Sequence, residues 1–246
     1  YRLPQTGGPA VKVAGGESTT IYGGEYRSQQ GDGIVTTGGS ATIYQGTFYG
    51  TDSETKAGPG ASYSFKVYGG TVTVKDGTFG SSDANGGGAF VAGTAQETAT
   101  AQINGGSFLS GGQAAFSILD NATVTFGENN AANITVSGYA AGLVLEGYNG
   151  IGSPEITING GNFSSTSTDE TESSAIWSGN PNFKLTINGG ELTGEAKDGI
   201  FIARRTWNNE SDPFIGTLKI TGGEITGKTH GLNLDRDIKS ENAVEI

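Results

Sequence analysis

Apolar and polar residues alternate along the chain in short runs, and glycine, asparagine or serine bounds most of these runs. One pattern recurs seven times: an aliphatic or β-branched pair around one polar residue, a turn that ends in glycine, one further residue and a bulky apolar residue. Alternation with a period of two residues predicts β-strands, and no stretch has helical spacing over three turns. The seven copies span residues 19–26, 41–48, 72–79, 101–108, 156–163, 185–192 and 218–225.

The second glycine of each turn gives the length of the repeat. These glycines lie 22, 31, 29, 55, 29 and 33 residues apart. We interpret the interval of 55 as two repeats with a degraded copy between them, within residues 122–136. Val124–Phe126 and Ile134–Val136 both alternate there, but neither has the Gly-Gly turn. About eight repeats result, at a period typical of solenoid proteins.

A second strand follows most turns and runs from a small residue into alternating apolar positions, as in Gly199-Ile200-Phe201-Ile202. Repeats of two or three short strands without helices predict a parallel β-helix, in which each coil hydrogen-bonds to the next. A leucine-rich repeat is disfavoured because its Leu-x-x-Leu-x-Leu frame is absent. The predicted fold class is therefore all-β: one right-handed parallel β-helix domain of about eight coils over residues 1–246.

Two equivalent positions in the repeat are expected to form columns. Asn104, Asn159 and Asn188 share one corner, where they either form a ladder of amide hydrogen bonds or act only as turn-forming residues. A second, inward position carries aromatic residues that give way to aliphatic ones, which predicts an internal stack. Its members are Tyr26, Phe48, Phe79, Phe108, Phe163, Leu192 and Ile225.

Composition limits the possible functions. Glycine supplies 44 of the 246 residues, as the many corners of a solenoid require. There is no cysteine for a disulfide or a thiolate metal site. A net charge of −11 without a basic stripe disfavours nucleic acid and anionic membranes as partners. No apolar run is long enough to span a membrane.

The start of the sequence and its asparagine triplets are compatible with an extracellular location, although the triplets do not argue for one. Because the chain lacks methionine, Tyr1 is not a translation start, which is consistent with removal of a leader. In a secreted protein, Asn-x-Ser/Thr triplets are acceptors for N-glycosylation. The candidate asparagines are Asn121, Asn133, Asn162 and Asn209, of which Asn162 and Asn209 are expected to point outward.

The scaffold resembles that of polygalacturonases and polysaccharide lyases, but the motifs of those enzymes are missing. The nearest segments to the polygalacturonase signatures are Thr229-His230-Gly231 and Arg236-Asp237-Ile238-Lys239. His230, the sole histidine, occupies the position that Asp198 fills one coil earlier, so a role at a corner accounts for both. We therefore expect no enzymatic activity, no catalytic residue and no cofactor.

Charged residues near the end of the sequence form one further candidate site. Asp235 and Asp237 flank Arg236, and Arg204 lies one coil earlier. Such a mixed patch could hold a uronic acid or a calcium ion, although a solvated surface is the simpler interpretation. The spacing of a calcium loop is absent from the chain, so no metal site is predicted.

A column of threonines is expected on one outer face, at Thr20, Thr42, Thr73, Thr157 and Thr186. Regular threonine columns occur on ice-binding solenoids, but threonine is also favoured on exposed strands. Gln102 and Lys219 interrupt this column, and only one column is regular. Ice binding is accordingly the weakest of the functional hypotheses.

The repeat as a whole resembles those of secreted, glycine-rich β-helix proteins on microbial surfaces, including adhesin-like proteins and appendage or filament proteins. The resemblance implies a non-enzymatic extracellular protein that acts as a rigid stalk, adhesin or filament subunit. The alternative is a β-helix that binds or degrades polysaccharide. For that alternative, Trp177 on a strand and Trp207 in a loop are the candidate stacking residues, with Arg204 and Arg236 as possible glycan contacts.

Neither end of the sequence supplies an amphipathic helix that would cap the solenoid. We therefore expect this domain to belong to a longer chain or a larger assembly. Its expected partners are further copies packed end to end or other surface proteins, and possibly polysaccharide.

Overall fold

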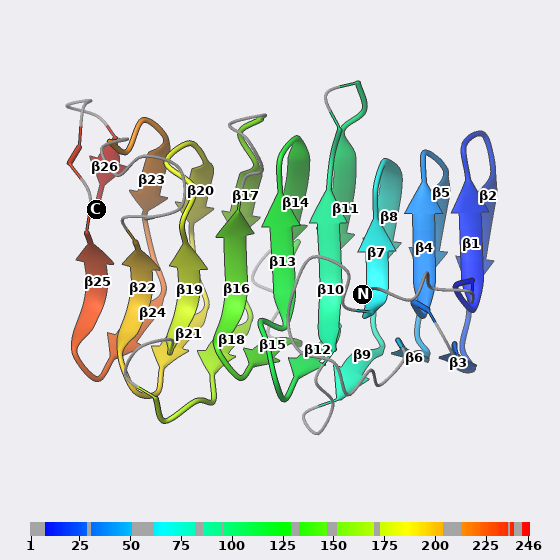
Figure 1. Ribbon diagram of the computed structural model, residues 1–246, viewed down its shortest axis with the longest axis horizontal. Coiled ribbons are helices and arrows are strands. Elements are labelled where there is room, and N and C mark those ends of the chain that lie inside the picture. The colour runs from blue at the N-terminus through cyan, green and yellow to red at the C-terminus, as the bar shows by residue number, and fades with distance from the viewer. Residues whose placement is uncertain are drawn as a thin grey trace, which may run out of the picture.

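The structure is a computed structural model. It describes residues 8–28, 31–50, 62–81, 86–94, 96–128, 133–146, 152–169, 173–203, 213–235, 237–238 and 243–246. These residues form a parallel β-solenoid of three sheets and contain no helix, which confirms the predicted all-β parallel β-helix fold, although the number of coils differs slightly from the prediction (Figure 1). Consequently, the described part of the chain has no helix that could cross a membrane.

Successive strands along the chain go to the three sheets in turn, so each sheet contains every third strand (Figure 1). Sheet A has nine strands: β1 (Val11–Ala14), β4 (Ile34–Thr37), β7 (Tyr63–Val67), β10 (Gly87–Ala92), β13 (Phe116–Leu119), β16 (Ala141–Glu146), β19 (Ser174–Ser178), β22 (Asp198–Ile202) and β25 (His230–Leu234). Sheet B also has nine: β2 (Ser18–Ile21), β5 (Ser40–Ile43), β8 (Gly70–Val74), β11 (Ala99–Ile103), β14 (Ala122–Phe126), β17 (Glu155–Ile158), β20 (Lys184–Ile187), β23 (Thr217–Ile220) and β26 (Val244–Glu245). Sheet C has eight: β3 (Glu25–Arg27), β6 (Thr47–Tyr49), β9 (Thr78–Ser81), β12 (Gly106–Ser110), β15 (Ile134–Gly138), β18 (Asn162–Ser165), β21 (Glu191–Gly194) and β24 (Glu224–Gly227).

Glycine is required at the corner between sheets B and C. The repeat glycines there have φ between 96° and 147°, in the left-handed region that other residues rarely adopt. At Gly77, an added Cβ would also lie 2.9 Å from the carbonyl oxygen of Gly46, one coil earlier. Both the dihedral angle and the space between coils therefore exclude a side chain at this position. The residues concerned are Gly24, Gly46, Gly77, Gly106, Gly161, Gly190 and Gly223.

The predicted internal stack is present in sheet C. The rings of Tyr26, Phe48, Phe79 and Phe108 are nearly parallel, and successive centroids are 4.9, 5.0 and 4.6 Å apart. This spacing follows the separation of about 4.8 Å between neighbouring strands. Val136 takes the next place in the column, which then continues through Phe163, Leu192 and Ile225 as expected.

The degraded repeat forms an ordinary coil. Val124–Phe126 lies in β14 of sheet B, and Ile134–Val136 lies in β15 of sheet C. Both segments are therefore strands of this coil. Ile134 aligns with Gly106, so a β-branched residue occupies the position of the repeat glycine in this coil.

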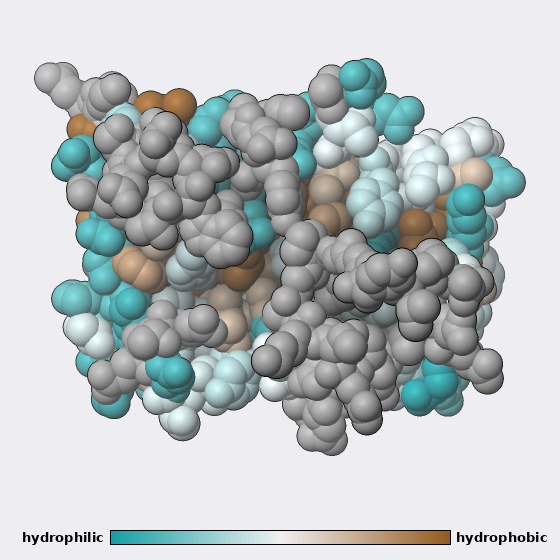
Figure 2. Space-filling model, viewed as in Figure 1, coloured by the Kyte–Doolittle hydropathy of each residue, from teal (hydrophilic) through white to brown (hydrophobic). Residues whose placement is uncertain are grey.

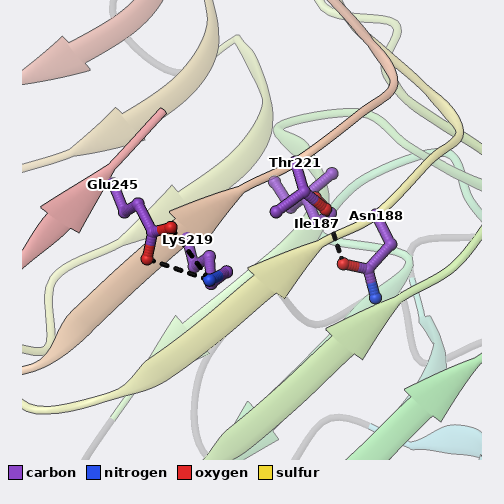
Figure 3. Close-up of polar contacts among 5 residues, drawn as sticks. All are labelled: Ile187, Asn188, Lys219, Thr221 and Glu245. Carbon is purple, nitrogen blue, oxygen red and sulfur yellow. Dashed lines mark hydrogen bonds and ion pairs between the residues drawn. The ribbon is translucent and has the colours of Figure 1, made fainter.

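The asparagine ladder forms over part of its expected length. Asn188 donates from Nδ2 to Oδ1 of Asn159 at 2.8 Å. Thr221 donates from Oγ1 to Oδ1 of Asn188, also at 2.8 Å (Figure 3). Asn159 in turn donates to the carbonyl oxygen of Gly127. Because glycine occupies the corner at Gly127, Asn104 is separated from the ladder and accepts a hydrogen bond from Gln102 instead.

Candidate functional site

The outer face of sheet A carries one column of side chains with an apolar middle. Strand alternation points one residue per strand outward at this position, and register pairing aligns these residues from coil to coil. Phe90, Val144, Trp177 and Phe201 are half-buried, so each keeps part of its surface exposed. Figure 2, from the side of sheet A, shows patches of apolar surface along the middle of this face. In order, the outer column consists of Lys12, Val35, Lys66, Phe90, Ser117, Val144, Trp177, Phe201 and Asn233.

The longest connections of the solenoid lie at the two corners that border sheet A. Residues 50–62 and 166–173 connect sheet C to sheet A, and residues 147–154 and 203–216 connect sheet A to sheet B. The B-to-C corner is short in most coils, as in residues 22–24 and 188–190. Insertions into a solenoid repeat usually gather around the binding face, so their distribution singles out sheet A.

A buried ion pair at Lys66 lies on one side of the apolar middle of the outer column. Lys66 Nζ lies 2.9 Å from Asp32 Oδ1, and the two side chains are only 8% and 12% exposed. The same Asp32 oxygen accepts a hydrogen bond from the backbone N–H of Tyr63 at 2.8 Å. Lys66 also lies 5.2 Å from the centroid of the Tyr63 ring. Since its charge is already paired, Lys66 is a structural residue of this face.

On the other side of the apolar middle, a second aspartate occupies the same position of the repeat as Asp32. Asp198 is fully buried, and its Oδ1 lies 2.9 Å from Nδ1 of His230. Its Oδ2 accepts a hydrogen bond of 3.0 Å from Nδ2 of Asn233. Each aspartate thus holds the residue at the start of the next sheet A strand and the outer-column residue three positions later. The two polar clusters flank the apolar middle of the column.

The predicted glycan-binding residues are only partly within the described chain. Trp177 lies on β19 and points outward, as the alternation predicted. Phe201 is its register partner on β22, and the ammonium nitrogen of Lys197 lies 4.2 Å from the centroid of the Phe201 ring. Trp207, Arg204 and Arg236 lie outside the described residues. The stacking surface next to Trp177 is therefore Phe201.

The candidate glycosylation sites differ in their surroundings. Asn162 is exposed on β18, as predicted, and Asn133 is exposed before β15. Asn121 donates from Nδ2 to the carbonyl oxygen of Thr94 at 2.7 Å, so its amide is already engaged. Asn209 lies outside the described residues. Asn133 and Asn162 therefore present their amides most openly.

The charged residues near the end of the sequence do not share a strand. β25 ends at Leu234, so strand alternation does not place Asp235 and Asp237 on one face. His230 aligns with Asp198 at the corner of sheet A, as the sequence predicted. Within the described ranges, no group of three or more histidine or acidic side chains is placed to hold a metal ion.

The chain was also compared with known proteins. No family model, curated protein or solved structure matched it. Functional inference therefore rests on the geometry of the solenoid faces.

The outer face of sheet B is polar. The predicted threonine column is present, and Thr125 of the degraded repeat extends it. A second column lies beside it, which the sequence analysis missed: Ser18, Ser40, Thr71, Thr100, Thr123, Glu155, Lys184 and Thr217. Ion pairs interrupt both columns, between Lys184 and Glu155 in one and between Lys219 and Glu245 in the other (Figure 3).

Sequence analysis missed several residues of the sheet A face, although one signal was available. The tripeptide Asp-Gly-Ile occurs at Asp32 and again at Asp198, each time at the entry to a sheet A strand. This repeat marks both aspartates as equivalent. The alignment of Phe90, Val144 and Phe201 with Trp177 had no such signal, because the number of residues between strands varies from coil to coil.

Proposed function

We propose that this chain is a non-enzymatic, rigid surface protein of the adhesin type, located outside the cell, with the outer face of sheet A as its binding face. The observation that carries the proposal is the combination of an outer column with apolar residues in its middle and long connections confined to the two corners that border it. Neither feature is needed to stabilise a solenoid, whose core lies inside the coils.

Rigidity supports the role of a stalk or spacer. The strands of sheet A pair in parallel from β1 to β25 without interruption, and the strands of sheet B do so from β2 to β26. Continuous stacking of this kind leaves no hinge between the paired strands. A binding face on such a rod keeps its residues at fixed spacing.

A carbohydrate ligand is the favoured class because aromatic residues lie on the binding face. Phe90, Trp177 and Phe201 all belong to the outer column and retain exposed surface. Aromatic rings flanked by a few polar groups are typical of ligand sites that need both apolar contact and orientation. Sugar rings, with one apolar face and a hydroxyl rim, match this combination.

Binding of the purified chain to an array of neutral and acidic oligosaccharides would test the proposal. We expect binding that Val144→Glu abolishes, because the substitution places a charge in the middle of the apolar column. Thr125→Glu is the matched control, since Thr125 is half-exposed on sheet B in the same coil as Val144. Loss of binding in Thr125→Glu with retention in Val144→Glu would place the binding face elsewhere.

The absence of enzymatic activity is tested separately. We expect no release of reducing ends or unsaturated products from polygalacturonate, pectin or alginate. Cleavage that disappears in Asp235→Ala or Arg204→Ala would contradict a purely structural and binding role.

A further inference from the structure

We propose that Trp177, Phe201, His230 and Asn233 form a subsite for an uncharged pyranose unit of a glycan that lies along sheet A, with Asp198 as the residue that positions its polar side. This inference rests on the function proposed above and assigns the ligand class and the contacting atoms. It concerns three neighbouring strands, β19, β22 and β25.

The apolar side of the subsite is an aromatic platform. Trp177 and Phe201 are register partners on adjacent strands, so their side chains leave the sheet side by side at a separation of about 4.8 Å between strands. Both are half-buried, which fixes the rings against the sheet while part of each stays exposed. Lys197 lies over one side of the Phe201 ring and adds a hydrogen-bond donor at the rim.

The polar side of the subsite presents two acceptor atoms in fixed positions. A carboxylate only accepts hydrogen bonds, so the atoms of His230 and Asn233 that face Asp198 must be N–H groups. In the tautomer that carries its hydrogen on Nδ1, the His230 ring has no hydrogen on Nε2, so Nε2 and Oδ1 of Asn233 are the acceptors on the other side. No described residue hydrogen-bonds to either atom. Asp198 itself is fully buried, so it acts through these two residues.

Acceptor atoms beside an aromatic platform favour a ligand that is rich in hydroxyl groups and has an apolar face. A uronate or phosphate carries acceptors of its own, which cannot pair with Nε2 and Oδ1. The net charge of −11 adds a general repulsion of anions. An uncharged sugar ring donates from its hydroxyls and stacks through its C–H groups, so it satisfies both sides of the subsite.

An extended peptide is a poorer candidate than a sugar for the ligand of this subsite. Peptides commonly bind β-proteins by adding a strand to a free sheet edge. β19 is paired on both edges, to β16 and to β22, and β22 is paired to β19 and β25. Main-chain pairing is therefore not available to a ligand at Trp177, whereas stacking on the outer face is.

Intrinsic fluorescence can report on this subsite directly. The chain has two tryptophans, so Trp207→Phe leaves Trp177 as the single reporter. We would titrate this variant with cellohexaose, mannohexaose and chitopentaose, with oligogalacturonate as the charged probe and a decapeptide as the third class. We expect a saturable change in emission with at least one neutral oligosaccharide and none with oligogalacturonate or the peptide.

Two further substitutions test the polar side in the Trp207→Phe background. Asp198→Asn keeps the shape of the side chain but has only one acceptor oxygen for two donors. Asn233→Ala removes Oδ1 from the surface, together with the hydrogen bond from Nδ2 to Asp198. We expect each to weaken binding by about tenfold, the effect of losing one good hydrogen bond. Tyr44→Ala, which removes an aromatic ring that is 47% exposed elsewhere on the solenoid, is expected to leave binding unchanged.

The outcomes separate this inference from the proposed function. Oligosaccharide binding that calorimetry detects and Val144→Glu abolishes, but that leaves the emission of Trp177 unchanged, would overturn the subsite and support the binding face. Failure of every glycan to bind would overturn both. Equal affinity for oligogalacturonate, or full affinity in Asn233→Ala, would overturn the assigned ligand class or the assigned contacts.

Discussion

Sheets A and B are built alike but carry different outer faces. Both consist of nine parallel strands in register, and both turn aliphatic side chains into the same core. The outer face of sheet A has an apolar column between two buried aspartates, and that of sheet B has hydroxyl columns interrupted by exposed ion pairs. The inward positions therefore specify the fold, while the outward positions are free to vary and give one face an apolar column and the other a polar surface.

The largest difference in unfolding free energy is expected between the loss of an inward-facing ring and the loss of an outward-facing ring. Phe108 is fully buried in the internal stack, and Phe108→Ala should destabilise the protein by about 3–5 kcal/mol because it leaves a cavity. Phe90→Ala on the outer face of sheet A should cost about 1 kcal/mol through lost contacts with the rings of Tyr63 and Tyr68. Urea unfolding measures both. A loss below about 1 kcal/mol for Phe108→Ala would mean that its ring does not belong to the core.

The ion pairs on the two faces should differ strongly in how much they contribute to the free energy of unfolding. Lys66→Ala leaves the Asp32 carboxylate buried without its counter-charge and should cost about 3–5 kcal/mol. Lys184→Ala removes the partner of Glu155 on sheet B, where the side chains are 58% and 51% exposed, and should cost about 0–1 kcal/mol. Similar losses for the two variants in urea unfolding would contradict the contrast between the faces.

A smaller effect on stability is expected at the corner between sheets B and C. Asn188→Ala removes hydrogen bonds to Asn159 and Thr221 and should reduce the free energy of unfolding by about 1 kcal/mol. Asn104 occupies the same corner outside the ladder, and its Nδ2 has no partner among the described residues. Asn104→Ala should therefore cost less than Asn188→Ala, and the reverse order would show that the ladder does not stabilise the corner.

The smallest effect is expected within β19 of sheet A. Ser174 is 1% exposed, and its Oγ has no hydrogen-bond partner among the described residues, so Ser174→Ala should change stability by less than about 0.5 kcal/mol. Ser178 on the same strand donates from Oγ to the carbonyl oxygen of Leu145. Ser178→Ala should cost about 1–2 kcal/mol. Thermal unfolding of the two variants under identical conditions gives the comparison.

Local pattern sufficed to predict most of the fold. The glycine corner, the internal stack through Phe163 and the outward position of Trp177 all depend on residues within one repeat, where alternation and turn chemistry act directly. The register of Asp198 with His230 was also visible, because both precede a glycine and an apolar strand.

The chemistry of the sheet A face depended on contacts between coils. Asp32 and Lys66 are 34 positions apart in sequence, and a connection of irregular length separates them. No local pattern shows that Lys66 turns back to the aspartate of the preceding coil. The second hydroxyl column on sheet B was missed for the same reason, since its members align only when the register of every coil is known.

Parallel stacking sets a regular distance between equivalent residues of successive coils. Each coil advances the outer column by about 4.8 Å, whatever the length of the connections between its strands. Phe90 on β10 and Phe201 on β22 are four coils apart, and the distance between their strands is thus about 19 Å. Duplication of one repeat between them would lengthen this distance by one strand separation, about 4.8 Å. The spacing of outward residues could therefore evolve to fit a longer or shorter polymer by a change in the number of whole repeats. Such a change would not require a new connection between strands.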